Sequence, residues 1–152
     1  MLELSSTKLI SQQEMTRICL EAGADDVGFV SIDNHAVAEQ TADIRAALPS
    51  TRTLISLVVR MNREAIRSTK RSVANLEFHS TGDETNLIAR RIVRELEDRG
   101  VKALNPSMGF PMEMTQFPGK IWVVPHKPIA EAAGMGKIGI HRNVIHPKFG
   151  SF

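Results

Sequence analysis

Apolar residues recur at helical spacing near the start of the chain. Ser11-Gln12-Gln13-Glu14 has the form of a capping box, in which the serine and glutamate side chains satisfy backbone N–H groups that a helix start leaves free. Apolar residues then follow at intervals of three and four: Met15, Ile18, Cys19 and Ala22. Gly23 stands where a helix ends, so the pattern predicts a first helix between Ser11 and Gly23.

The same spacing predicts two further helices. Residues 82–99 place one set of apolar residues on one face and charged residues elsewhere, and Gly100 closes the segment. The apolar set is Leu87, Ile88, Ile92, Val93 and Leu96. Residues 36–48 form a shorter helical pattern that Pro49 ends.

Short apolar runs between these helices predict strands. Residues 26–32 and 53–61 are apolar almost without interruption and are bounded by turn-forming residues, which is typical of strands covered on both faces. Residues 101–104 and 121–124 predict two more short strands. Helices and strands in near alternation indicate an α/β or α+β fold, a layered sheet with flanking helices, in a single domain over residues 1–152.

The pattern fails between Asn105 and Gly119, where prolines, glycines, methionines and phenylalanines follow neither periodicity. A loop of this length within a compact domain is commonly functional. Methionine and aromatic side chains offer adaptable contacts to a large flat ligand, and Met112, Phe117 and Trp122 are the candidates here. The alternative is that these side chains cover an edge of the core, because methionine is a common gap filler.

Charge is distributed unevenly although the net charge is only +2. Residues 114–152 hold five lysines and arginines against one glutamate, which leaves fourteen basic and sixteen acidic residues in the preceding part. Such a separation is expected where an anion binds locally, although basic runs are also common on solvated faces.

The composition excludes some classes of protein. The only cysteine, Cys19, excludes an internal disulfide and cannot by itself hold an iron–sulfur cluster. The chain has neither a secretory signal nor a long apolar run, so we expect a cytoplasmic protein with no membrane partner.

The basic part contains Gly134-Met135-Gly136-Lys137-Ile138-Gly139-Ile140-His141-Arg142-Asn143, which has the Gly-x-Gly-x-x-Gly spacing of dinucleotide-binding loops. Such a loop follows a strand and opens a helix, whereas here the preceding residues 128–133 predict a short helix that Gly134 ends. We therefore expect the glycines to allow positive φ or close approach of a ligand. Their N–H groups, with Lys137 and Arg142, would suit a phosphate.

Two histidines, His126 and His141, are candidates for a proton donor because the pKa of histidine lies near neutrality. A loop histidine bonded to backbone is the alternative for His126. The spacing of the histidines does not indicate a metal site built from side chains.

The sequence resembles a known family over two segments. Residues 128–143 and 146–152, reading PIAEAAGMGKIGIHRN and HPKFGSF, are similar to the signature of the cobalamin-binding domain shared by epoxyqueuosine reductases and corrinoid reductive dehalogenases. Residues 23–29, GADDVGF, are similar to the start of the family's first strand. The resemblance is specific over residues 128–150.

This resemblance implies a nitroreductase-like fold, bound cobalamin and a reductase activity. It also implies electron supply from a ferredoxin-like module with two 4Fe-4S clusters, a module that is missing from this chain, so we expect the chain to be the N-terminal part of a longer protein. The proton donors of the family do not carry over: Lys120 lies in the region that holds an aspartate in one branch, and the tyrosine of the other branch has no counterpart because the chain contains no tyrosine.

Three functions remain open at this stage. The first is a cobalamin-dependent oxidoreductase acting on a small or tRNA-borne substrate, with Lys120, His126 or His141 in catalysis. The second is an FMN-binding nitroreductase-like enzyme, and the third is a non-catalytic corrinoid-binding or electron-transfer accessory domain, which could form a homodimer. The cofactor-binding set is Gly134, Met135, Gly136, Lys137, Gly139, Arg142, Met112, Phe117 and Trp122.

Overall fold

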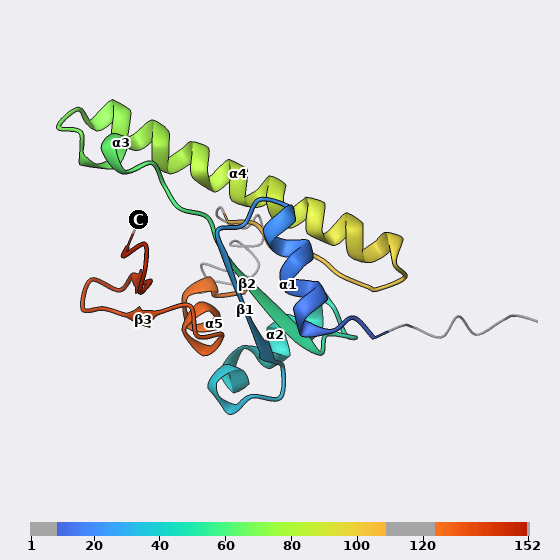
Figure 1. Ribbon diagram of the computed structural model, residues 1–152. Helices are drawn as coiled ribbons and strands as arrows, with labels where there is room; N and C mark the ends of the chain where they lie inside the picture. Colours follow the sequence, from blue (N-terminus) through green and yellow to red (C-terminus); the bar gives the residue numbers. More distant parts are fainter. Residues whose placement is uncertain (1–8, 109–123, 152) are drawn as a thin grey trace, which may run out of the picture.

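The computed structural model describes residues 9–108 and 124–151 and has an α+β fold (Figure 1). Its order is α1 (Gln12–Glu21), β1 (Asp26–Ser31), the 3-10 helix η1 (His35–Gln40), α2 (Thr41–Ala47), β2 (Thr53–Val58), α3 (Arg63–Arg67), α4 (Arg71–Asp98), α5 (His126–Ala132), β3 (Lys137–Ile138) and β4 (Val144–Ile145). The strands form two antiparallel pairs, β1 with β2 and β3 with β4.

Helices cover both faces of the β1–β2 pair, as the apolar runs predict. Side chains alternate between faces along a strand, and the register opposes Val27 to Leu57 and Val30 to Leu54. Val27 and Leu57 pack with α1 and α4, in a cluster built on Ile18, Cys19, Ala24, Ile88, Ile92 and Leu96. Val30 and Leu54 pack on the other face with η1, α2 and α5, around Ile32, Val37, Ile44 and Ile129.

The start of α1 confirms the predicted capping box in part. The Ser11 side chain accepts a hydrogen bond from the Glu14 N–H at 3.1 Å, and Gly23 follows the helix with φ of +119°. A Cβ at residue 23 would also lie 3.2 Å from the Ile88 side chain. Glycine therefore serves both the helix end and the packing of α1 against α4.

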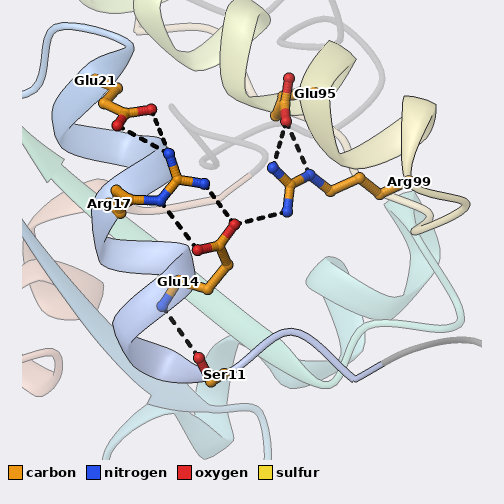
Figure 2. A network of polar contacts seen from close by, with 6 residues as sticks. All are labelled: Ser11, Glu14, Arg17, Glu21, Glu95 and Arg99. Carbon is orange, nitrogen blue, oxygen red and sulfur yellow. Dashed lines mark hydrogen bonds and ion pairs between the residues drawn. The ribbon is translucent and has the colours of Figure 1, made fainter.

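The Glu14 side chain joins α1 to α4 instead of reaching back to the Ser11 N–H (Figure 2). Arg17 donates to Glu14 and to Glu21 along α1, and Arg99, at the end of α4, donates to both Glu14 and Glu95. The two guanidinium groups lower the pKa of the Glu14 carboxyl to about 2.

Helix α4 is longer than its sequence pattern predicts, since it begins at Arg71 and not near Gly82. The added turns carry no fully buried side chain before Thr81, so they lack the apolar stripe that marks the later part. Leu87, predicted on the apolar face, is 55% exposed. That assignment is wrong because Ile88, Ile92 and Leu96 are the residues of α4 that are buried in the apolar cluster with α1. Val93 is partly buried.

Two other predictions also needed correction. Residues 101–104 are not a strand: Val101 and Ala103 pack against the core, and no strand among residues 9–108 and 124–151 pairs with this segment. The predicted helix over residues 36–48 is divided into η1 and α2. Residues 121–123 of the predicted strand at 121–124, and most of the irregular loop at 105–119, lie outside the described residues. Val124 is described and is not in a strand.

The described residues 9–108 and 124–151 contain no helix with the length and apolar character that crossing a bilayer requires.

Candidate functional site

The segment from α5 onward forms one hydrogen-bonded unit. Gly134 ends α5 in the left-handed region with φ of +80°, its N–H donates to the Glu131 carbonyl, and the next N–H, of Met135, donates to the Ala130 carbonyl. These two bonds define a Schellman motif, which satisfies the last carbonyls of the helix. A Cβ at Gly134 would have no heavy atom within 4 Å, so this backbone stays open.

The hairpin of β3 and β4 follows directly. The Gly139 N–H donates to the Asn143 carbonyl at 2.9 Å, and the Arg142 N–H donates to the Gly139 carbonyl at 2.9 Å, which closes a tight loop over Ile140–Arg142. Arg142 has φ of +62°, the left-handed conformation that such a hairpin loop needs at this place and that normally favours glycine or asparagine. An arginine here is strained, and its side chain is exposed.

The other two glycines of the motif have neighbours within the protein. A Cβ at Gly136 would collide with the Ile145 carbonyl oxygen, and one at Gly139 would lie 2.7 Å from the His141 ring and 2.9 Å from the Ile145 side chain. The absence of a side chain at Gly136 and Gly139 is therefore explained by the closely packed hairpin. Gly134 is the motif glycine whose surroundings are open.

Side chains hold the hairpin against α5. The Glu131 carboxylate accepts from the Ile138 N–H at 2.6 Å, and Lys127 Nζ donates to Asn143 Oδ1 at 2.9 Å. Both bonds connect a residue of α5 to the hairpin that follows it. Glu131 is the only acidic residue after residue 113, and its carboxylate is already engaged by backbone.

The unit is also tied to β1. His146 Nε2 lies 2.7 Å from Asp26 Oδ2, and the Nδ1 atom of the same ring accepts the N–H groups of Lys148 and Phe149 at 3.0 and 3.2 Å. Because Nδ1 accepts, the proton must reside on Nε2, which donates to Asp26. The Phe149 ring stacks on the imidazole with centroids 4.8 Å apart.

A second contact with β1 occurs at Gly28. A Cβ at this position would collide with the Ala133 carbonyl oxygen and lie 2.6 Å from Met135 Cε. Met135 is itself buried, with 8% of its surface exposed. Strand β1 and the end of α5 thus approach so closely that only glycine fits between them.

The structure brings most of the candidate residues together in the hairpin, and it places the two histidines at the start of α5 and in the hairpin loop. Gly136, Lys137, Gly139 and Arg142 share the hairpin, next to Gly134, and the Lys137 and Arg142 side chains are exposed on it. His126 starts α5, where its Nε2 lies 3.0 Å from the Ser107 carbonyl, and His141 lies in the hairpin loop with Nε2 3.0 Å from Ser151 Oγ. Lys120, Met112, Phe117 and Trp122 lie outside the described residues.

Sequence reasoning did not predict the contact between Asp26 and His146. The two residues are separated by 120 positions, and no periodicity connects a strand start with a closing turn. The contacts of Gly28, Asp26 and His146 arise only in the folded chain, where β1 lies beside the carboxyl-end unit, residues 126–151. Within residues 9–108 and 124–151, no three histidine, cysteine, aspartate or glutamate side chains converge in a way that could hold a metal ion.

Comparison of the chain with protein-family models, with curated proteins and with solved structures found no match.

Proposed function

We propose that the chain is a cobalamin-binding domain of the reductase type, with a nitroreductase-like fold, which reduces its substrate when electrons arrive from an iron–sulfur donor. The carboxyl-end unit, residues 126–151, would supply the binding surface for the cofactor together with the start of β1. Cobalamin, when bound, supplies a cobalt centre that can be reduced and can pass electrons to a substrate.

The observation that carries the proposal is a contact between distant segments. The two parts of the sequence that resemble the cobalamin-binding family, residues 23–29 and 128–150, meet through Gly28 against Ala133 and through Asp26 against His146. Two segments so far apart in the sequence need not be neighbours in the folded chain. The contact between residues 23–29 and 128–150 therefore supports one shared site formed by both segments.

The residues of the unit suit the charged part of such a cofactor. Gly134 offers open backbone in a left-handed turn, and Lys137, Arg142 and Lys148 are exposed. Cobalamin carries a phosphodiester in its nucleotide tail, and guanidinium and ammonium groups are the usual partners of phosphate oxygens. Gly136 and Gly139 would shape the hairpin that carries these cations and would not themselves contact the tail.

Of the two histidines, His141 is the better candidate for a proton donor. A carbonyl oxygen only accepts, so the proton on His126 Nε2 is engaged by Ser107. The partner of His141 Nε2 is the Ser151 hydroxyl, which can both donate and accept, and the His141 side chain is exposed. His141 can therefore release a proton to a substrate and recover one through Ser151.

Absorption spectra distinguish the possible cofactors. The purified chain is mixed with hydroxocobalamin or with FMN, passed over a desalting column and examined from 300 to about 600 nm, where corrin and flavin bands differ. Retained corrin bands at a one-to-one ratio support the proposal. Retained flavin bands would identify FMN as the cofactor in place of cobalamin. A colourless protein would contradict cobalamin binding and favour an accessory domain without this cofactor.

Charge-removing variants locate the surface. Lys137→Gln together with Arg142→Asn removes two cations, and asparagine tolerates the left-handed conformation of residue 142. We expect hydroxocobalamin to bind about tenfold more weakly, the usual effect of losing charge-assisted hydrogen bonds. Lys102→Gln, an exposed lysine beyond the end of α4, is the matched control and should bind as the wild type does.

A further inference from the structure

A groove lies along α4, away from the carboxyl-end unit. The groove has a volume of about 740 Å³, within the range of small-molecule sites. It is lined by Asp83, Asn86, Leu87, Arg90, Val93, Arg94, Glu97 and Asn105. Arg90 and Ile92 are two residues apart and point to opposite sides of the helix, so the groove faces away from the core that contains Ile92.

The basic residues of this groove differ from the other arginines in the same part of the chain. Arg91 donates to the Ala22 carbonyl, and Arg99 is paired with Glu14 and Glu95. Arg90 and Arg94 have no hydrogen bond or ion pair with any residue in the described ranges 9–108 and 124–151. They stand four residues apart on one face, where two like charges weaken a helix. A bound anion would relieve that repulsion.

A neutral donor lies beside the two guanidinium groups. Asn86 Oδ1 accepts the Met108 N–H at 3.1 Å, which orients the amide and leaves its NH2 group as a donor on the groove wall. Asn105 adds a second amide to the lining. Two guanidinium groups and amide donors match the several oxygens of a phosphate better than a single-point anion.

Carboxylates line the groove on both sides of the two arginines along α4. Asp83 lies two turns before Arg90 and Glu97 lies one turn after Arg94, and both line the groove. Neither carboxylate is paired with Arg90 or Arg94 among the described residues. Carboxylates repel phosphate but accept hydrogen bonds from sugar hydroxyls. This order of charges along α4 suits a ligand with a phosphate in the middle and hydroxyl groups at one end.

We propose that the outer groove of α4 binds a phosphorylated small molecule that carries hydroxyl groups, such as a sugar phosphate or a nucleotide. The phosphate contacts Arg90 and Arg94, and the hydroxyl groups contact Glu97, the carboxylate nearer along α4 to this arginine pair. This site is separate from the proposed cofactor surface, because its described lining includes no residue of the carboxyl-end unit.

Calorimetric titration of the whole chain tests the proposal with three probes: ribose 5-phosphate, inorganic pyrophosphate and ribose, all at one ionic strength. We expect ribose 5-phosphate to bind and ribose not to bind. The double variant Arg90→Gln with Arg94→Gln should lose at least about tenfold in affinity, because it removes both charge-assisted contacts. Arg71→Gln, an exposed arginine at the start of α4 that has no ion pair with the described residues, should change affinity less than twofold.

Glu97→Gln separates the two halves of the ligand. The substitution should weaken ribose 5-phosphate binding and strengthen pyrophosphate binding, since it replaces a charged acceptor of hydroxyl hydrogen bonds by a weaker neutral one and removes a repulsive charge. Circular dichroism verifies that each variant remains folded.

Three results would overturn the proposal. The first is ribose 5-phosphate binding no better than ribose, and the second is full affinity in the double variant. The third is an RNA duplex that binds through Arg90 and Arg94 while ribose 5-phosphate does not, which would make the groove a contact for a nucleic-acid backbone.

Discussion

At the scale of single residues, glycine at position 28 is required by packing and not by backbone conformation. Its missing Cβ leaves room for the Ala133 carbonyl and the Met135 side chain. Backbone atoms cannot move aside as a flexible side chain can. Strand β1 can therefore approach the end of α5 only because residue 28 has no methyl group on its Cα atom.

We predict opposite effects for two glycine-to-alanine substitutions. Gly28→Ala should lower the free energy of unfolding by about 1–3 kcal/mol through overpacking. Gly82→Ala, within α4 with nothing near the added Cβ, should raise it by about 0.5–1 kcal/mol through helix propensity. Urea unfolding measures both. Equal effects of the same sign would mean that β1 and α5 do not approach so closely.

Cys19 is a buried thiol that the protein shields from reaction. The residue has 0% of its surface exposed, and burial raises the pKa of its thiol to about 11. Thiolate is the reactive form, so an aromatic disulfide reagent at pH 8 should react with native Cys19 at least about a hundredfold more slowly than with the urea-unfolded chain. Rapid labelling of the native chain would show that the α1–α4 contact opens easily.

At the scale of elements, the ion-pair network of Figure 2 joins α1 to α4 at the Glu14 carboxylate. The folded-state pKa of Glu14, about 2, is lower than the ordinary 4.5. Its contribution to stability is therefore present above about pH 4.5 and is lost as the pH falls toward 2.

We expect Glu14→Gln to show this loss directly. The gap in urea midpoint between wild type and Glu14→Gln should be constant above pH 5 and should close between about pH 4.5 and pH 2. Glu39→Gln, an exposed glutamate in η1, serves as the control and should show no such gap. A gap that stays constant down to pH 2 would contradict the low pKa of Glu14.

Local signals in the sequence were sufficient for most elements. The Ser11 cap and the helix end at Gly134 each act within a few residues, and the helices that they define, α1 and α5, were predicted correctly. The periodic Ile88, Ile92 and Leu96 predicted the later part of α4. The start of α4 carries no such signal, because Lys70 provides no side-chain cap and the turns before Thr81 bury no apolar side chain.

Contacts between distant segments could not be predicted from those local signals. Residues 101–104 have the composition of a strand, yet within residues 9–108 and 124–151 no strand pairs with them. Their apolar side chains Val101 and Ala103 pack against the core. The glycine motif was recognised, but the roles of Gly136 and Gly139 depend on Ile145 and His141, which only the folded hairpin brings next to them.

At the scale of the whole molecule, the contact between Asp26 and His146 connects the first strand to the carboxyl-end unit. This imidazole has its polar atoms engaged at both ends, by a carboxylate on one side and by two backbone N–H groups on the other. It therefore holds both the closing turn and the unit as a whole in place against β1.

We predict that His146→Ala releases this end of the chain. The lost bonds should lower stability by about 2–4 kcal/mol, and limited trypsin digestion should cut sooner after Lys137, Arg142 and Lys148. Asp26→Asn keeps an oxygen acceptor for Nε2 and should be cut more slowly than His146→Ala. Equal resistance of His146→Ala and wild type would show that the imidazole does not hold the unit in place.

We propose that the carboxyl-end unit and the start of β1 together form a binding surface for cobalamin. The most direct measurement is equilibrium dialysis of the chain against hydroxocobalamin, read at the corrin bands, for wild type and for Lys137→Gln with Arg142→Asn. We expect one corrinoid to bind to each wild-type chain and about tenfold weaker binding to the variant. Equal corrinoid concentrations on both sides of the membrane with the wild-type chain would contradict the proposed binding surface.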